Sequence, residues 1–161
     1  MRTFQNVLRL AWVAAAAASL AACGNMGSSS SSSSSAMGSS ASAATMNFGA
    51  TLSAAAEVPP NASSGSGTLT ATLDKATNVF TYRVVYTGLT GPATMAHIHG
   101  PAMPGANAGV VLPFQGATSP IEGSAPLTAA QVADLTAGRL YVNVHTAANP
   151  GGEIRGQVML K

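Results

Sequence analysis

The chain has 161 residues, of which 47% are hydrophobic and only 7% are charged, and its formal net charge is +2. A single cysteine excludes an internal disulfide. The length leaves room for one domain of ordinary size beside a targeting segment.

Residues 1–22 are predicted to form a secretory signal peptide. Arg2 and Arg9 supply a positive start, and Leu10–Leu20 is an apolar run rich in alanine. About eleven apolar residues are too few for a helix that crosses a bilayer of ~30 Å. Small residues stand immediately before Cys23, an arrangement that resembles the bacterial lipobox. We therefore expect lipid attachment at Cys23; the alternative is an ordinary signal peptide with a chance cysteine.

Removal of the signal peptide changes the charge of the chain. Seven Lys and Arg less Arg2 and Arg9 leave five positive side chains against five Asp and Glu, so the net charge becomes zero. No basic patch remains for nucleic acid, and no polybasic segment remains for an anionic membrane surface. The expected partners are the membrane, through more than one acyl chain on Cys23, and an unknown extracytoplasmic protein or ligand, but no nucleic acid.

Residues 23–45 are predicted to be the lipidated Cys23 followed by a disordered Ser/Gly/Ala linker. The tract contains an unbroken run, Ser28–Ser35, and too few large apolar side chains to offset its ordering entropy. Its typical reach is roughly 25 Å. Gly24 and Asn25 stand where inner-membrane retention signals usually carry Asp. We therefore expect a bacterial cell-envelope protein at the outer membrane, on its periplasmic or surface face, although the sorting rule varies among bacteria.

Residues 46–161 are expected to form one all-β domain. In Gly67–Leu73, threonines alternate with apolar residues, and Val79–Tyr86 follows after a turn cluster, which indicates a β-hairpin. Short strands separated by Gly and Pro predict a Greek-key β-sandwich or barrel. The further strands are predicted at Met46–Leu52, Thr94–His99, Val110–Phe114, Ile121–Ala125, Leu140–His145 and Glu153–Leu160.

One segment does not show the two-residue alternation of a strand. Thr128 and Gln131 have the spacing of a capping box, Val132 and Leu135 follow at helical separation, and Gly138 ends the pattern. We predict a short helix over Thr128–Ala137, the only helix of the domain.

Five motifs, in this order, resemble the CHRD (chordin-type) domain. The resemblance covers nearly all of residues 46–161 and implies an extracytoplasmic domain, but it identifies no reaction and carries no signalling role. The motifs are Ala56–Pro60 (AEVPP), Gly88–Leu89, Ala96–Ala102 (AHIHGPA), Leu127–Gly138, which is similar to the family's LTxxQxxDLxxG helix, and Tyr141–Gln157, which is similar to its terminal NVHTxxNPGGEIRGQ.

Most of these motif residues have a structural interpretation. Asn149–Gly152 is a turn in which Pro fixes φ and Gly supplies positive φ. Glu153 and Arg155 share one face of a strand, so we expect them to pair with one another or across strands. The same structural interpretation applies to Glu57, Pro59, Pro60, Asn143, Asn149, Gly151 and Gly152, and Met46, Met95 and Met159 are expected to be packing residues.

The three histidines, His97, His99 and His145, are candidate metal ligands. Residues i and i+2 of a strand point to the same side, so His97 and His99 present two imidazoles with Cα atoms about 7 Å apart, and His145 could complete the set from a neighbouring strand. Imidazole suits copper and zinc, but a catalytic zinc takes three protein ligands and a structural zinc takes four. The alternative is that the histidines bond backbone groups where turns enter the sandwich.

A weaker resemblance, to copper/zinc superoxide dismutase, bears on this choice. Gly88–Thr90 before His97–Gly100 is similar to that enzyme's GLT before an HxH copper motif, and Gly138–His145 is similar to its late strand. The resemblance implies that the three histidines match three of its four copper ligands. The expected Greek-key fold therefore has two alternatives, an immunoglobulin-like one and a superoxide-dismutase-like one. The bridging histidine, the zinc loop and the disulfide have no counterpart, so the match favours the fold more than the activity.

No other chemistry has a motif. The sequence contains no G-x-S-x-G and no Gly-rich phosphate loop, and its glutamates stand singly, so no catalytic residue is assigned. Two function classes remain. The first is a membrane-anchored extracytoplasmic CHRD lipoprotein with a binding or structural role, which requires no cofactor. The second is a copper- or zinc-binding domain that uses the three histidines. This alternative includes a residual redox activity like that of superoxide dismutase.

Overall fold

The computed structural model describes residues 44–161. The predicted signal peptide, Cys23 and nearly all of the predicted linker lie outside the described residues. Within residues 44–161, none of the helices has the length and apolar character needed to cross a bilayer.

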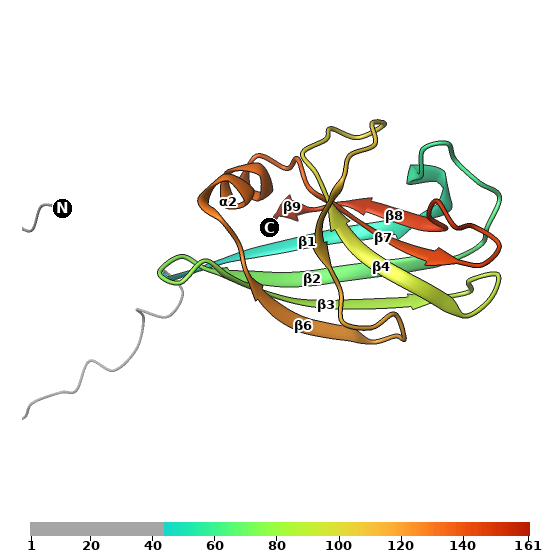
Figure 1. Cartoon of the computed structure of the whole chain (residues 1–161), viewed down its shortest axis with the longest axis horizontal. Helices are drawn as coiled ribbons and strands as arrows, with labels where there is room; N and C mark the ends of the chain where they lie inside the picture. Colours follow the sequence, from blue (N-terminus) through green and yellow to red (C-terminus); the bar gives the residue numbers. More distant parts are fainter. Residues whose placement is uncertain (1–43) are drawn as a thin grey trace, which may run out of the picture. The chain divides into compact units, whose positions relative to one another are not determined.

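The described residues form an all-β structure, as predicted. The predicted helix, Thr128–Ala137, is observed as α2 (Ala129–Thr136) (Figure 1). A 3₁₀ turn, η1 (Ala54–Ala56), precedes the second strand. The strands are β1 (Thr45–Ser53), β2 (Ser66–Asp74), β3 (Val79–Thr87), β4 (Ala93–His99), β5 (Val110–Pro113), β6 (Ile121–Pro126), β7 (Tyr141–Thr146), β8 (Ile154–Gln157) and β9 (Met159–Leu160).

The strands form one antiparallel sheet with the order β5-β4-β7-β8-β1-β2-β3-β6, and β9 pairs with β1. β3 pairs with β6, and β4 pairs with β7. These neighbouring strands are not consecutive in the chain, as in a Greek key. The two edge strands, β5 and β6, are consecutive in the chain. Phe114, just after β5, stacks on Tyr82 of β3 with ring centroids 4.2 Å apart. This contact links the segment after β5 to β3, the strand beside the other edge, and the sheet curves into a nearly closed barrel.

The barrel interior is filled by the inward-facing side chains of the strands, which alternate along each strand with outward-facing ones. Leu69, Ala71 and Leu73 of β2 are buried, whereas the intervening threonines are exposed. Val142 and Val144 of β7 are fully buried against the same core. The alternation read from the sequence therefore identified the core face of each of these strands.

The helix begins where the capping box predicts. The Thr128 side chain accepts a hydrogen bond from the backbone N–H of Gln131, and the Gln131 side chain accepts one from the backbone N–H of Thr128. Leu135 is buried beneath the helix, and Gly138 at φ +67° follows its end.

The last predicted strand, Glu153–Leu160, is divided into two. β8 pairs with β7 through residues 154–157, whereas β9 pairs with β1. Between them Val158 is fully buried, and its N–H donates to the carbonyl of Leu140. Alternation alone could not reveal this change of partner, because the apolar residues continue on both sides of it.

The core makes a direct stability prediction. Leu73 is fully buried on β2, which lies between β1 and β3, so Leu73→Ala should lower the free energy of unfolding by about 2–5 kcal/mol. Thr72→Ala is the matched control, since the neighbouring Thr72 side chain is exposed and its replacement should change stability by no more than about 0.5 kcal/mol. Chemical denaturation of both variants measures the difference, and equal losses would contradict the assigned core face.

Candidate functional site

Strand β7 is buried on both of its faces. Val142 and Val144 face the barrel core, whereas Tyr141, Asn143 and His145 face outward and are nevertheless buried. The cover over this outer side comes from two long connections, residues 54–64 and 100–109. A second, polar layer therefore lies outside the barrel, between β4, β7 and β8 and these connections.

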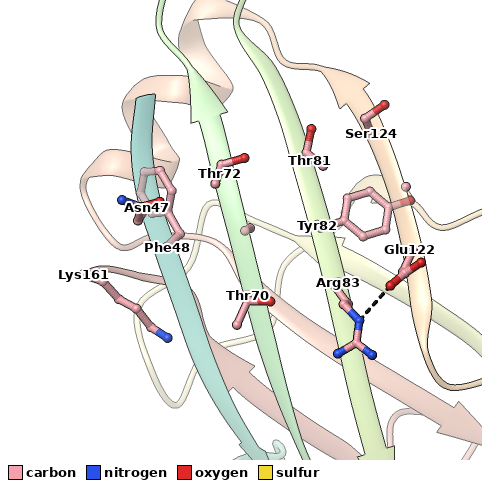
Figure 2. A pocket seen from close by; sticks show the side chains of 12 residues that line it. Asn47, Phe48, Thr70, Thr72, Thr81, Tyr82, Arg83, Glu122, Ser124 and Lys161 are labelled. Atoms are coloured by element: carbon pink, nitrogen blue, oxygen red, sulfur yellow. Dashed lines mark hydrogen bonds and ion pairs between the residues drawn. The ribbon is translucent and has the colours of Figure 1, made fainter. Parts of the chain in front are cut away.

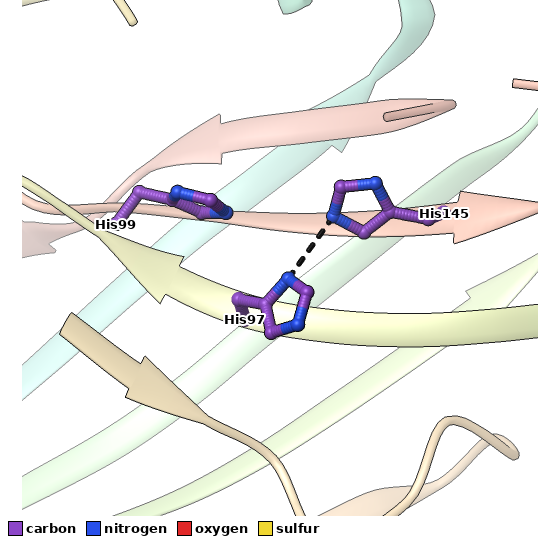
Figure 3. Close-up of side chains that lie close together, drawn as sticks. All are labelled: His97, His99 and His145. Carbon is purple, nitrogen blue, oxygen red and sulfur yellow. Dashed lines mark hydrogen bonds between the residues drawn. The ribbon is translucent and has the colours of Figure 1, made fainter. Parts of the chain in front are cut away.

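The three histidines meet in this layer (Figure 3). His97 and His99 project from β4, and His145 projects from β7, the strand paired with β4. One ring nitrogen from each residue can be chosen so that all three lie within 4.8 Å of one another. The closest pair is His97 Nδ1 and His145 Nε2, 3.2 Å apart. The structure thus brings together every histidine that the sequence singled out.

The other ring nitrogens contact carbonyl oxygens, which defines the tautomers. His99 Nδ1 donates to the carbonyl of Ala108 at 3.0 Å, and His145 Nδ1 donates to the carbonyl of Pro150 at 3.0 Å. In a neutral imidazole the second nitrogen is then an acceptor. His99 Nε2 is buried and has no hydrogen-bond partner among residues 44–161. A buried lone pair without a partner is costly, unless a proton or a cation meets it.

A further acceptor lies at the same place. The side-chain oxygen of Asn143 is 2.9 Å from His145 Nε2, on the side that also faces His97. With His145 Nδ1 donating to Pro150, the Nε2 atom is an acceptor. It can accept a proton from His97 Nδ1, or from the Asn143 amide once its oxygen and nitrogen are exchanged.

The protonation equilibria agree with this geometry. Burial lowers the pKa of His97, and the neighbouring His145 and His99 lower it further. Burial also lowers the pKa of His145, against the opposing effect of its hydrogen bond to Pro150. Both rings are therefore held neutral near pH 7, which is the form that can bind a metal ion.

Next to the histidines, three side chains form a stack. The His99 ring lies on the Tyr141 ring with centroids 4.9 Å apart and planes 4° apart, and the Arg155 guanidinium lies 3.4 Å from the centroid of Tyr141. Arg155 also donates to the side chain of Asn107 and to the carbonyl of Ala106. The stack fixes the His99 ring and ties the 100–109 connection to β8.

The expected pairing of Glu153 with Arg155 is wrong. Glu153 precedes β8 and accepts hydrogen bonds at one end of the barrel from Ser63, Thr90, Thr146 and Asn149. Burial alone would raise the pKa of Glu153, but the bonds from Ser63, Thr146 and Thr90 outweigh it and lower the pKa to about 2. This carboxylate is therefore ionised without a paired cation among residues 44–161, and its role in the fold is to join three connections.

Glu57 is the other buried carboxyl group. Burial raises its pKa to about 7, even though the Arg155 charge and the backbone of Val58 act in the opposite direction. Its Oε1 atom has no hydrogen-bond partner within the described part of the chain. A Cβ atom at Gly152 would collide with Glu57 and with the amide of Asn143, so glycine is required there for close approach.

The other motif residues named in the sequence analysis lie around the predicted turn at residues 149–152. The N–H of Gly152 donates to the carbonyl of Asn149, closing the predicted turn, and Gly152 has positive φ, whereas Gly151 does not. Pro59 and Pro60 line a hollow of about 250 Å³ beside this turn, together with Glu57.

The methionines were only partly predicted. Met46 packs against the core, as expected. Met95 and Met159 were also expected to be packing residues, but their side chains are 48% and 53% exposed, so that interpretation is wrong for both.

A larger hollow, of about 770 Å³, lies on the outer side of β1, β2, β3 and β6 (Figure 2). Thr70, Thr72, Thr81 and Ser124 give it a hydroxyl-rich wall. Its charged side chains Arg83 and Glu122 form an exposed ion pair at 2.7 Å. The sequence analysis did not single out this surface, because exposed threonines are ordinary in strands.

Comparison with known proteins identifies the class. The fold is an all-β barrel with a histidine cluster under its long connections, and residues 48–158 match the CHRD domain. Since the match covers more than half of the chain, the protein belongs to the CHRD domain family. Neither the curated proteins nor the solved structures contain a match to the chain.

Sequence reasoning found the three histidines but missed the groups that orient them. Ala108 and Pro150 act through carbonyl oxygens, which every residue possesses, so no side-chain pattern marks them. Alternation along β7 puts Tyr141 on the same face as His145, but its stacking on His99 depends on the register of β4 with β7.

Glu153 allows a test of this electrostatic arrangement. Its pKa is about 2 in the folded protein and 4.5 as an ordinary glutamate, so the unfolded chain binds more protons between these values. The stability from Glu153 should therefore be complete above about pH 5 and should be lost as the pH falls toward 2. Glu153→Gln should lower the free energy of unfolding at pH 7 by on the order of 2–3 kcal/mol, with a smaller loss at pH 3.

Glu122→Gln is the matched control, because Glu122 is an exposed partner in a surface ion pair and should contribute no more than about 1 kcal/mol. Urea denaturation between pH 3 and pH 7 measures both variants. A deficit of Glu153→Gln that does not change with pH would contradict the low pKa.

Proposed function

We propose that the protein is a lipid-anchored CHRD-domain protein of the bacterial cell envelope whose folded domain binds one copper ion through His97, His99 and His145. The observation that carries the metal proposal is His99 Nε2, a buried nitrogen without a partner in the described structure whose ring is held by Ala108. The tautomer of His99 directs a lone pair, rather than a proton, toward the other two rings.

The nitrogen separation supports a shared ion. His97 Nδ1 and His145 Nε2 are 3.2 Å apart, which is the separation that two ligands take around one ion with metal–nitrogen bonds of about 2.0–2.1 Å. All three donors fall within 4.8 Å, so a small closing movement of His99 would complete the set. The residues present therefore fit a metal ion.

Copper is favoured over zinc by the order of metal affinities. The three histidines match the ligand count of a catalytic zinc site but not the four ligands of a structural one. For a given set of nitrogen donors, Cu²⁺ binds more tightly than Zn²⁺. When bound, the ion would supply a Lewis-acidic centre, while the carbonyls of Ala108 and Pro150 orient the rings of His99 and His145.

The anchoring part of the proposal comes from the sequence before the described residues. An apolar run of signal-peptide length ends in small residues at Cys23, the only cysteine of the chain. Acylation there would hold the protein at the envelope, with the outer membrane as the proposed location and with the residues between Cys23 and β1 as the spacer.

Copper binding tests the main proposal. The full chain carrying Cys23→Ser, so that no thiol competes, should bind about one equivalent of Cu²⁺ at pH 7 by calorimetric titration. Binding should weaken below about pH 6, because protonated imidazole cannot ligate. His97→Ala should abolish this binding, while its far-ultraviolet circular dichroism remains that of the parent.

Asn107→Ala is the control, because it alters the cover over the histidines without removing a nitrogen donor. It should retain one copper equivalent. A parent protein that takes up no Cu²⁺, or a His97→Ala variant that binds as well as the parent, would refute the proposal and leave the histidines with a structural role.

Lipid attachment is tested separately. The wild-type protein should partition into the detergent phase and sediment with membranes, because acyl chains on Cys23 supply the apolar surface. Cys23→Ser should accumulate as unprocessed or soluble precursor. Detection of wild-type protein in the soluble fraction with a free thiol, by mass spectrometry, would rule out the lipoprotein assignment.

A further inference from the structure

Met95 lies on the same side of β4 as the histidines. Alternate residues of a strand face the same way, so Met95, His97 and His99 share the outer side, while Ala96 and Ile98 are buried in the barrel core. The strand therefore presents one thioether and two imidazoles in consecutive outward positions.

The strand register places Met95 against the third histidine. In the β4–β7 ladder, Met95 is the direct partner of His145, and His97 is the direct partner of Asn143. Directly opposed residues of an antiparallel pair have Cβ atoms about 4.5–5.5 Å apart. Met95 is thus a neighbour of His145 across the ladder and of His97 along the strand.

Met95 does not contribute to the barrel core. Its side chain faces outward and is 48% exposed, whereas Met46 packs against the barrel interior. His97, two residues further along the strand, is only partly buried, so the flexible thioether of Met95 and the His97 ring are both accessible on this side of β4.

We propose that Met95 supplies a thioether ligand to the histidine site, so that the site also binds Cu(I). This inference rests on the proposed copper function and adds a fourth, sulfur donor to its three nitrogens. Thioether sulfur is a soft ligand that selects Cu(I), whereas imidazole accepts both oxidation states of copper.

The test compares Cu(I) and Cu(II) affinities in one set of variants. The full chain with Cys23→Ser is titrated anaerobically with Cu(I) against a chromophoric chelator and, separately, with Cu²⁺. Met95→Leu keeps the size and apolar character of the side chain and removes the sulfur. Met159→Leu is the matched control, because Met159 is similarly exposed but lies on β9, which pairs with β1.

Met95→Leu should weaken Cu(I) binding by roughly tenfold or more, since even groups outside the first ligand shell change metal affinity by about 10–100-fold. It should change Cu²⁺ binding less than Cu(I) binding, and Met159→Leu should change neither. X-ray absorption of the Cu(I) form should show a sulfur neighbour in the parent and in Met159→Leu, and none in Met95→Leu.

The outcomes separate the two proposals. If the parent and Met95→Leu bind Cu(I) equally, or if no sulfur neighbour is seen in the parent, the thioether ligand is refuted while Cu²⁺ binding by the histidines still stands. If the parent binds neither Cu²⁺ nor Cu(I), the copper function itself fails.

Discussion

The outer side of β7 is the constraint on which this structure depends. A strand with one aliphatic face needs only a barrel interior, but β7 also buries Tyr141, Asn143 and His145 on the opposite face. Buried polar groups need partners, and here they come from different parts of the chain. The Tyr141 hydroxyl bonds Ala108 of the 100–109 connection, whereas His145 bonds Pro150 in the turn after β7 and also contacts His97 and Asn143. The segments that cover β7 therefore belong to the folded structure, because they supply partners that the barrel ladder does not.

This arrangement links the candidate site to the stability of the fold. Arg155 stacks on Tyr141, Tyr141 stacks on His99, and the same guanidinium bonds the covering connection. At the barrel end, Glu153 joins the connections that contain Ser63 and Thr90 to Thr146 of β7. The motif residues outside the histidine cluster thus hold the surroundings of the rings, which is why so many polar residues are buried around three imidazoles.

The sequence predicted the elements better than their long-range contacts. Alternation located the strands from Met46 to His145, and the Thr128 capping box located the helix, because both signals are local. The partners of Glu153 and Arg155 were not predictable, since they lie in connections without periodicity. The convergence of the histidines was expected from spacing alone. The orientation of the His99 and His145 rings required the positions of Ala108 and Pro150.

The attachment of the 100–109 connection has a kinetic consequence. It is held mainly by side-chain contacts, such as those of Arg155 with Ala106 and of Gln157 with Ala102, rather than by a strand ladder. Such segments open locally at a free energy below that of global unfolding. Each opening separates Ala108 from His99 and releases the ring from its fixed orientation. The residence time of any ligand held by His99 is therefore set by the lifetime of this closed cover, and not by the bond to the imidazole alone.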